Sequence, residues 1–114
     1  MAGPVFSEVK ALLDLIIADW KTKHHRDPDL EGAHSTDKFS WETKEELLAS
    51  VALDFPLIQP EVIGQNPKRG QEANIVVAFQ TGVDGNPRMP LGGPFRTPAE
   101  IQTLIDWIDA GCPE

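Results

Sequence analysis

The hydrophobic residues near the N-terminus follow the spacing of an amphipathic helix. Apolar residues recur at steps of three and four positions between Val5 and Trp20, and Glu8 and Asp14 are among the charged residues of the other face. This spacing matches the period of an α-helix. We therefore expect a first helix from about Val5 to His24.

The strongest helix signals lie near the C-terminus. Thr97 and Glu100 have the spacing of a capping box, in which each side chain accepts a hydrogen bond from the other residue's backbone N–H, and Pro98 fits the first helical position. Gly111 supplies a helix stop. The buried face between these signals is expected to contain Ile101, Leu104, Ile105 and Ile108, with Trp107 beside it.

Two shorter helices are expected in the middle of the chain. One begins after Thr43, whose hydroxyl can form a capping box with Glu46. The other covers about 70–79, although its run of β-branched residues, "NIVVAF", would also suit a strand by propensity. The apolar side of the helix after Thr43 is expected to contain Leu47, Leu48, Val51 and Leu53.

The remaining segments are expected to form loops. Ten prolines and nine glycines separate the patterned stretches, and both residue types favour turns. A length of 114 residues fits one small domain with a modest core. The sequence therefore predicts a single all-α domain over 1–114, with about four helices and long loops.

Three segments stand in an order that is typical of a known family. They are "FSEVKALLD" near the start, "VIGQNPKRGQEANIVVAFQTG" in the middle, and "RMPLGG" followed by the capped helix and "WIDAG". Together they resemble the c-type cytochrome domains of bacteria that carry an "MPxGG" loop, over most of the chain from Phe6 to Pro113. The resemblance implies a small cytochrome c-like fold and favours a helix for "NIVVAF".

The chain departs from this family where haem would be attached. In the family, the first helix ends in C-x-x-C-H, which bonds the haem and supplies an axial histidine. Without gaps, the two cysteine positions fall on Ile17 and Trp20, and the histidine position falls on Lys21. No covalent haem is expected. We expect Trp20 and Ile17 to fill part of the volume that haem would occupy.

Met89 matches the methionine that supplies the other axial ligand in the family. A thioether alone cannot hold haem, and core packing is the more ordinary role of a methionine. Met89 and Trp20 are thus expected to mark a vestigial haem pocket, with no cofactor bound. An alternative is haem held without covalent bonds, with His24 or His25 placed opposite Met89.

A second alternative is a transition-metal site in "HHRDPDLEGAH". This stretch holds His24, His25 and His34 among several carboxylates, and imidazole and carboxylate groups are common metal ligands. The spacing matches no closed metal motif, so a solvated polar loop is the simpler interpretation.

Composition narrows the classes of function. A net charge of -8 disfavours nucleic acid and anionic membrane surfaces as partners, and no apolar run approaches the roughly 20 residues of a membrane span. The single cysteine, Cys112, excludes an internal disulfide and favours a reducing, cytoplasmic compartment. No Ser–His–Asp arrangement or phosphate-binding loop is visible, so we do not expect an enzyme.

The leading hypothesis is therefore a haem-less accessory protein that binds another protein. The resemblance implies an enzyme subunit as partner, such as an oxidoreductase, because cytochrome domains commonly accompany such enzymes. An acidic surface suits docking to a basic patch. Phe39 and Trp41 lie in a polar stretch, where they either fold back onto the core or anchor a partner.

Overall fold

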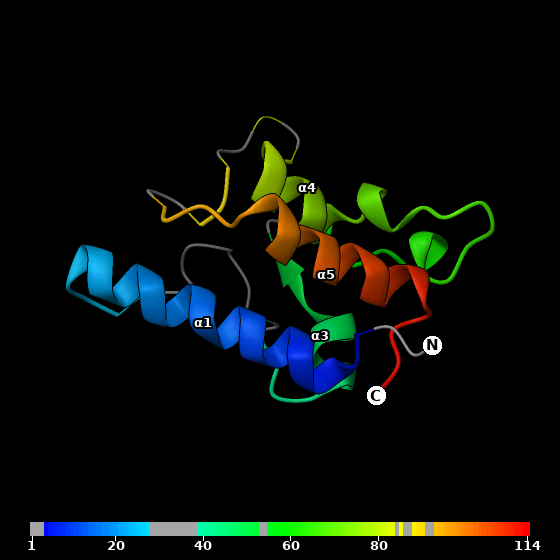
Figure 1. The fold of residues 1–114 in the computed structure, drawn as a ribbon, viewed down its shortest axis with the longest axis horizontal. Helices are drawn as coiled ribbons and strands as arrows, with labels where there is room; N and C mark the ends of the chain where they lie inside the picture. The colour runs from blue at the N-terminus through cyan, green and yellow to red at the C-terminus, as the bar shows by residue number, and fades with distance from the viewer. Residues whose placement is uncertain (1–3, 28–38, 53–54, 84, 86–87, 91–92) are drawn as a thin grey trace.

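The computed structural model describes residues 4–27, 39–52, 55–83, 85, 88–90 and 93–114. This part of the chain is mostly helical and includes one small antiparallel sheet. The two longest described helices, α1 (Phe6–His24) and α5 (Pro98–Asp109), pack against each other (Figure 1). The general prediction of a mostly helical domain is confirmed.

Helix α1 forms where the hydrophobic pattern predicts it. Its buried residues are Val9, Leu13 and Ile16, which recur at the expected spacing. The helix ends before His25, whose φ of 58° lies in the left-handed region. Among the described residues, no helix is both long and apolar enough to cross a membrane.

Helix α5 lies at the centre of the hydrophobic core, and its predicted capping box is confirmed. The Thr97 hydroxyl accepts from the Glu100 backbone N–H at 3.2 Å, and the Glu100 carboxylate accepts from the Thr97 N–H at 3.0 Å. Gly111 follows the helix with a φ of 93°, as expected for a C-terminal stop. The buried residues of α5 are Ile101, Leu104, Trp107 and Ile108, whereas Ile105 is only half-buried.

The helix expected after Thr43 is shorter than predicted. Helix α3 (Lys44–Ala49) is capped by the Thr43 hydroxyl but ends before Val51, which belongs to β1 (Val51–Ala52) and pairs with β2 (Phe55–Pro56). The helical assignment of Val51 is therefore wrong. The cause is Ser50, which has an extended backbone and whose buried hydroxyl contacts the backbone of the 39–42 segment. Leu53 lies outside the described residues.

The helix predicted over 70–79 is divided in two. Its two parts are a short 3-10 helix, η2 (Gly70–Glu72), and the α-helix α4 (Asn74–Gln80). Ala73 separates them, because its ψ of 137° interrupts the helix. Another 3-10 helix, η1 (Pro60–Val62), precedes both. The "NIVVAF" run is helical, as predicted, and buries its apolar face against the core. Gly70 allows η2 to approach α5, because a Cβ there would lie 2.6 Å from the Asp109 carboxylate.

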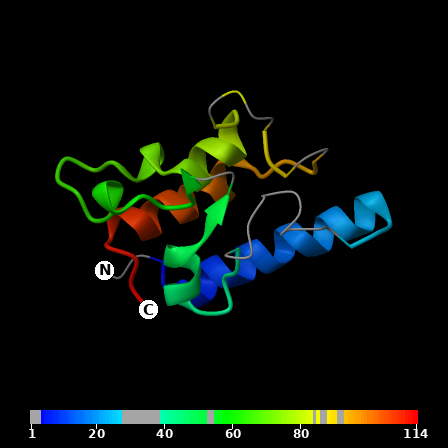
Figure 2. The same ribbon diagram turned by 180° about the vertical axis from the view of Figure 1, so that it is seen from behind.

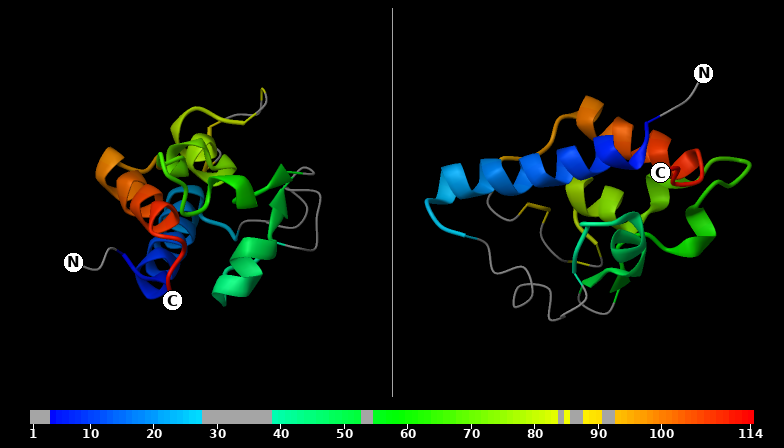
Figure 3. Two further views of the ribbon diagram at one scale, coloured as in Figure 1. Left: turned by 90° about the vertical axis from the view of Figure 1, so that its right-hand side faces the viewer. Right: turned by 90° about the horizontal axis from the view of Figure 1, so that it is seen from below.

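The start of α1 and the end of the chain are joined. The Phe6 backbone N–H donates to the Pro113 carbonyl at 3.0 Å, and the Trp107 indole N–H donates to the same oxygen at 2.7 Å. Figures 2 and 3 show the C-terminus beside the first turn of α1. These contacts fix one end of α1 against α5, while the other end of α1 extends away from α3 (Figure 3).

Candidate functional site

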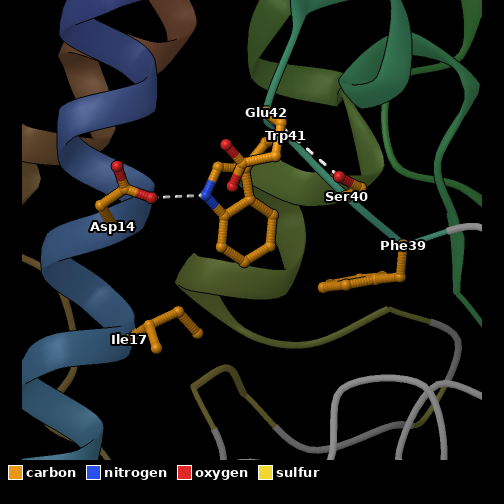
Figure 4. A pocket seen from close by; sticks show the side chains of 6 residues that line it. All are labelled: Asp14, Ile17, Phe39, Ser40, Trp41 and Glu42. Carbon is orange, nitrogen blue, oxygen red and sulfur yellow. Dashed lines mark hydrogen bonds between the residues drawn. The ribbon is translucent and has the colours of Figure 1, made fainter.

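An open hollow of about 320 Å³ lies between α1 and the segment 39–42 (Figure 4). Aliphatic and aromatic side chains form its inner walls, and carboxylates stand at its edge. We call this feature the acid-rimmed hollow. It is lined by Asp14, Ile17, Phe39, Ser40, Trp41 and Glu42.

Trp41 is held from two sides in the acid-rimmed hollow. Its indole N–H donates to the Asp14 carboxylate at 2.9 Å, as the dashed line in Figure 4 shows. Its ring lies edge-on to Phe39, with 5.7 Å between the centroids. Both aromatic residues are half-buried and pack against the core. Their packing onto the core is therefore as expected, and they also line an open surface, whereas a role in anchoring a partner stays a prediction.

The charged form of Asp14 is stabilised at the edge of the acid-rimmed hollow. The Lys10 ammonium lies 2.8 Å from the Asp14 carboxylate, and together with the Trp41 N–H it lowers the pKa of Asp14 below its ordinary value. Glu42 lies 3.8 Å from Lys10 and keeps 74% of its side chain exposed. Lys10 thus sits between two carboxylates, and the edge keeps a net negative charge.

Trp20 lies away from the acid-rimmed hollow, near the end of α1. Its ring stacks on His24 at a centroid distance of 4.2 Å, and the Arg26 guanidinium lies 5.4 Å from the Trp20 centroid. Trp20 is half-buried, as is Ile17, which lines the hollow instead. Their expected role in filling a former haem volume stays a prediction.

The end of α1 meets the loop that carries Met89. His24 donates from Nε2 to the Gly93 carbonyl, with 3.0 Å between the two atoms. Met89 is half-buried against the core, and its backbone N–H donates to the Ala78 carbonyl at 2.7 Å. In this arrangement the Nε2 atom of His24 is engaged by the Gly93 carbonyl. Neither His24 nor Met89 lines the acid-rimmed hollow or the second depression described below. A role for these residues at a haem site stays a prediction.

The three histidines expected at a metal site are not brought together within the described structure. His25 is exposed just beyond α1, and His34 lies outside the described residues. Within the described ranges, no group of three or more His, Cys, Asp or Glu side chains is placed to hold a metal ion. The three-histidine site therefore stays a prediction.

Two polar contacts were missed by sequence reasoning. One is the Asp14–Trp41 hydrogen bond. The only sequence feature that could have indicated it is the position of Asp14 within the apolar run "LLDLII". The other is the buried Arg96, which pairs with Asp19 at 2.9 Å and with Glu100 at 3.2 Å. No local pattern indicates the Arg96–Asp19 pair, because 77 positions separate the two residues.

In comparisons with known proteins, no family model, no curated protein and no solved structure matches the chain. The likeness to c-type cytochrome domains therefore rests on the three sequence segments quoted above. The described residues themselves define a small, mostly helical domain with an acid-rimmed aromatic hollow on its surface.

Proposed function

We propose that this chain is a non-catalytic accessory domain that binds another protein through the acid-rimmed hollow. The observation that carries the proposal is the combination of a fixed, half-buried Trp41 with the carboxylates of Asp14 and Glu42 at an open edge. Tryptophan is enriched among the residues that dominate binding energy in protein interfaces. The partner surface should therefore present cationic side chains around an apolar contact.

Charge and rigidity both support this role. The net charge of -8 favours the approach of a basic surface over long range. Trp41 is held by Asp14 and Phe39 before any partner arrives, so it loses little side-chain entropy on binding. A lysine or arginine of the partner can contact Glu42 and lie against the indole face, where cation–π attraction adds to the ion pair.

The partner proposed here is an enzyme subunit, such as an oxidoreductase. This part of the proposal rests on the sequence likeness to cytochrome domains, which commonly accompany such enzymes. Fold likeness alone does not fix a function, so the test must identify the partner as well as the surface that binds it.

Protein capture with charge-matched variants tests the proposal. Wild-type chain, Asp14→Asn/Glu42→Gln and the control Glu8→Gln/Glu61→Gln are immobilised and exposed to lysate of the cells that produce the chain. Both variants lose two negative charges, but Glu8 and Glu61 are exposed residues outside the hollow. A carbodiimide reagent then couples any carboxylate to a lysine that contacts it.

The expected result is one protein with a defined identity that is retained by the wild type and by the control. The Asp14→Asn/Glu42→Gln variant should lose it, and the cross-link should join Glu42 of the wild type to a partner lysine. Equal retention by all three proteins would contradict the proposal, as would cross-links confined to Glu8 or Glu61.

A second candidate function is electron transfer with haem held without covalent bonds. It is favoured by one contact, because His24 lies against the loop that follows Met89. It requires His24 to release the Gly93 carbonyl. Titration with haemin separates the candidates, with His24→Ala as the test variant and His25→Ala as the control. A spectral shift that needs His24 and not His25 supports the electron carrier, and equal spectra for both variants reject it.

A further inference from the structure

A second open depression, of about 240 Å³, lies beside the first turns of α5. It combines two arginines and two amide side chains with an apolar wall. We call it the arginine depression. It is lined by Gln80, Arg88, Arg96, Pro98, Ile101, Gln102 and Ile105.

Arg88 is held in place from two directions. Its Nε donates to the Phe79 carbonyl at 2.9 Å, and its guanidinium carbon lies 4.3 Å from the centroid of the Phe95 ring. Because the contact with Phe79 uses Nε, the two terminal nitrogens of the guanidinium can donate side by side to a ligand. A guanidinium fixed in this way loses little freedom when it binds an acceptor.

The charge of Arg88 is not offset by a carboxylate within the described part of the chain. Arg69 and Arg96 are both paired there, Arg69 with Glu72 and Arg96 with Asp19 and Glu100. A half-buried arginine without such a pair is unusual in a chain of net charge -8, because acidic side chains outnumber basic ones. Among the residues that the structure describes, Arg88 therefore supplies the unpaired positive charge of the arginine depression.

Arg96 adds a second donor that lacks an acceptor. Its side chain is 6% exposed, and its Nε has no hydrogen-bond partner among the residues described. Buried donors are nearly always satisfied by protein, water or ligand. An oxygen atom that entered the arginine depression far enough to reach Nε would satisfy it.

We propose that the arginine depression binds a small organic carboxylate with a short, branched aliphatic body. The terminal nitrogens of Arg88 match the two oxygens of a carboxylate, and Ile101 and Ile105 provide an apolar wall for the aliphatic part. This site is separate from the acid-rimmed hollow, with which it shares no lining residue. It gives the domain a ligand as well as a protein partner.

Nuclear magnetic resonance titration with 3-methylbutanoate tests the proposal, and 3-methylbutanamide serves as a neutral probe of the same shape. The acid should cause saturable shifts at the Gln80 and Gln102 amides, and the amide probe should not, because it lacks the charge that Arg88 recognises. Arg88→Gln should weaken binding of the acid about tenfold or more. Arg69→Gln, which removes an arginine elsewhere, should leave binding unchanged.

The proposal would be overturned by any of three results: no saturable shift with the acid, equal shifts with both probes, or unchanged affinity in Arg88→Gln. Circular dichroism checks that Arg88→Gln is folded. If it is not, the comparison of the acid with the amide probe on the unaltered chain still decides, because it needs no variant.

Discussion

Helix α1 borders two regions of opposite character. On one side, Val9, Leu13 and Ile16 are buried and join the core around α5. On an adjoining side, Asp14 and Ile17 face the acid-rimmed hollow, where Trp41 is held by a hydrogen bond and remains half-buried. The first region excludes water, and the second remains open to it.

This difference separates the residues that hold the fold together from those that are proposed to contact a partner. In the α5 core, Leu104, Trp107 and Ile108 are all 0% exposed, so each lost atom leaves a cavity. In the acid-rimmed hollow, ion pairs such as Lys10–Asp14 are exposed and contribute little to stability. Substitutions should therefore affect folding in the first region and binding in the second.

The largest expected effect is the loss of a buried tryptophan. Trp107→Ala should lower the free energy of unfolding by about 3–5 kcal/mol, because it leaves a cavity beside α5 and removes the hydrogen bond to Pro113. Trp41→Ala should cost only about 1–2 kcal/mol, since its ring is half-buried. Urea denaturation measures both. A greater loss of unfolding free energy for Trp41→Ala than for Trp107→Ala would contradict the placing of Trp107 in the core and Trp41 at the surface.

The next effect is a loss of stability at alkaline pH. Burial raises the pKa of the Cys112 thiol to about 11, from an ordinary value near 9.0. The unfolded chain therefore loses this proton first, so the stability that Cys112 contributes is complete below pH 9 and falls as pH rises to about 11. Raising the pKa from 9.0 to about 11 corresponds to a fall of about 2–3 kcal/mol.

The matched control for Cys112 is Cys112→Ala. Thermal unfolding measured at several pH values between 8 and about 11 should show a shallower decline for this variant than for the wild type. Parallel curves for the two proteins would mean that the thiol is not linked to folding in this range.

Helix caps offer a smaller comparison between the two regions. Thr97→Ala removes one half of a complete capping box and should cost about 1 kcal/mol. Thr43 caps α3 near the acid-rimmed hollow by accepting from the Glu46 N–H, so Thr43→Ala should cost less, because α3 has only six residues. Urea titrations of both variants test the order, and a larger loss for Thr43→Ala would contradict it.

The smallest expected effect on folding is at the acidic edge. At neutral pH, Asp14→Asn should change the midpoint of unfolding only slightly, because the Lys10 pair is exposed. The lowered pKa of Asp14 means that its contribution is present above pH 3.8 and is lost as pH falls through the lower folded value. The stabilities of the wild type and Asp14→Asn, measured as a function of pH, should therefore become equal below that range. If the stability curves of the two proteins stayed equally separated at every pH, the protonation of Asp14 would not be linked to folding.

Local patterns predicted most of the helices and little of the candidate site. The complete box at Thr97 and Glu100 and the spacing of Val9, Leu13 and Ile16 are signals within one helix, so they can be read without the fold. The turn at Ser50 is accompanied by hydrogen bonds to Ser40, and the break at Ala73 by a hydrogen bond from the Asn74 N–H to Gln59, so both depend on contacts with other segments. The Asp14–Trp41 bond joins residues 27 positions apart, and no periodicity encodes such a contact.

The central claim is that the chain acts through its surface and not through bound haem. The most direct test is the absorption spectrum of freshly purified protein, combined with elemental analysis of the same sample. The account predicts no Soret band and no stoichiometric metal. A Soret band with one iron per chain would contradict it and would establish that haem is held without C-x-x-C-H.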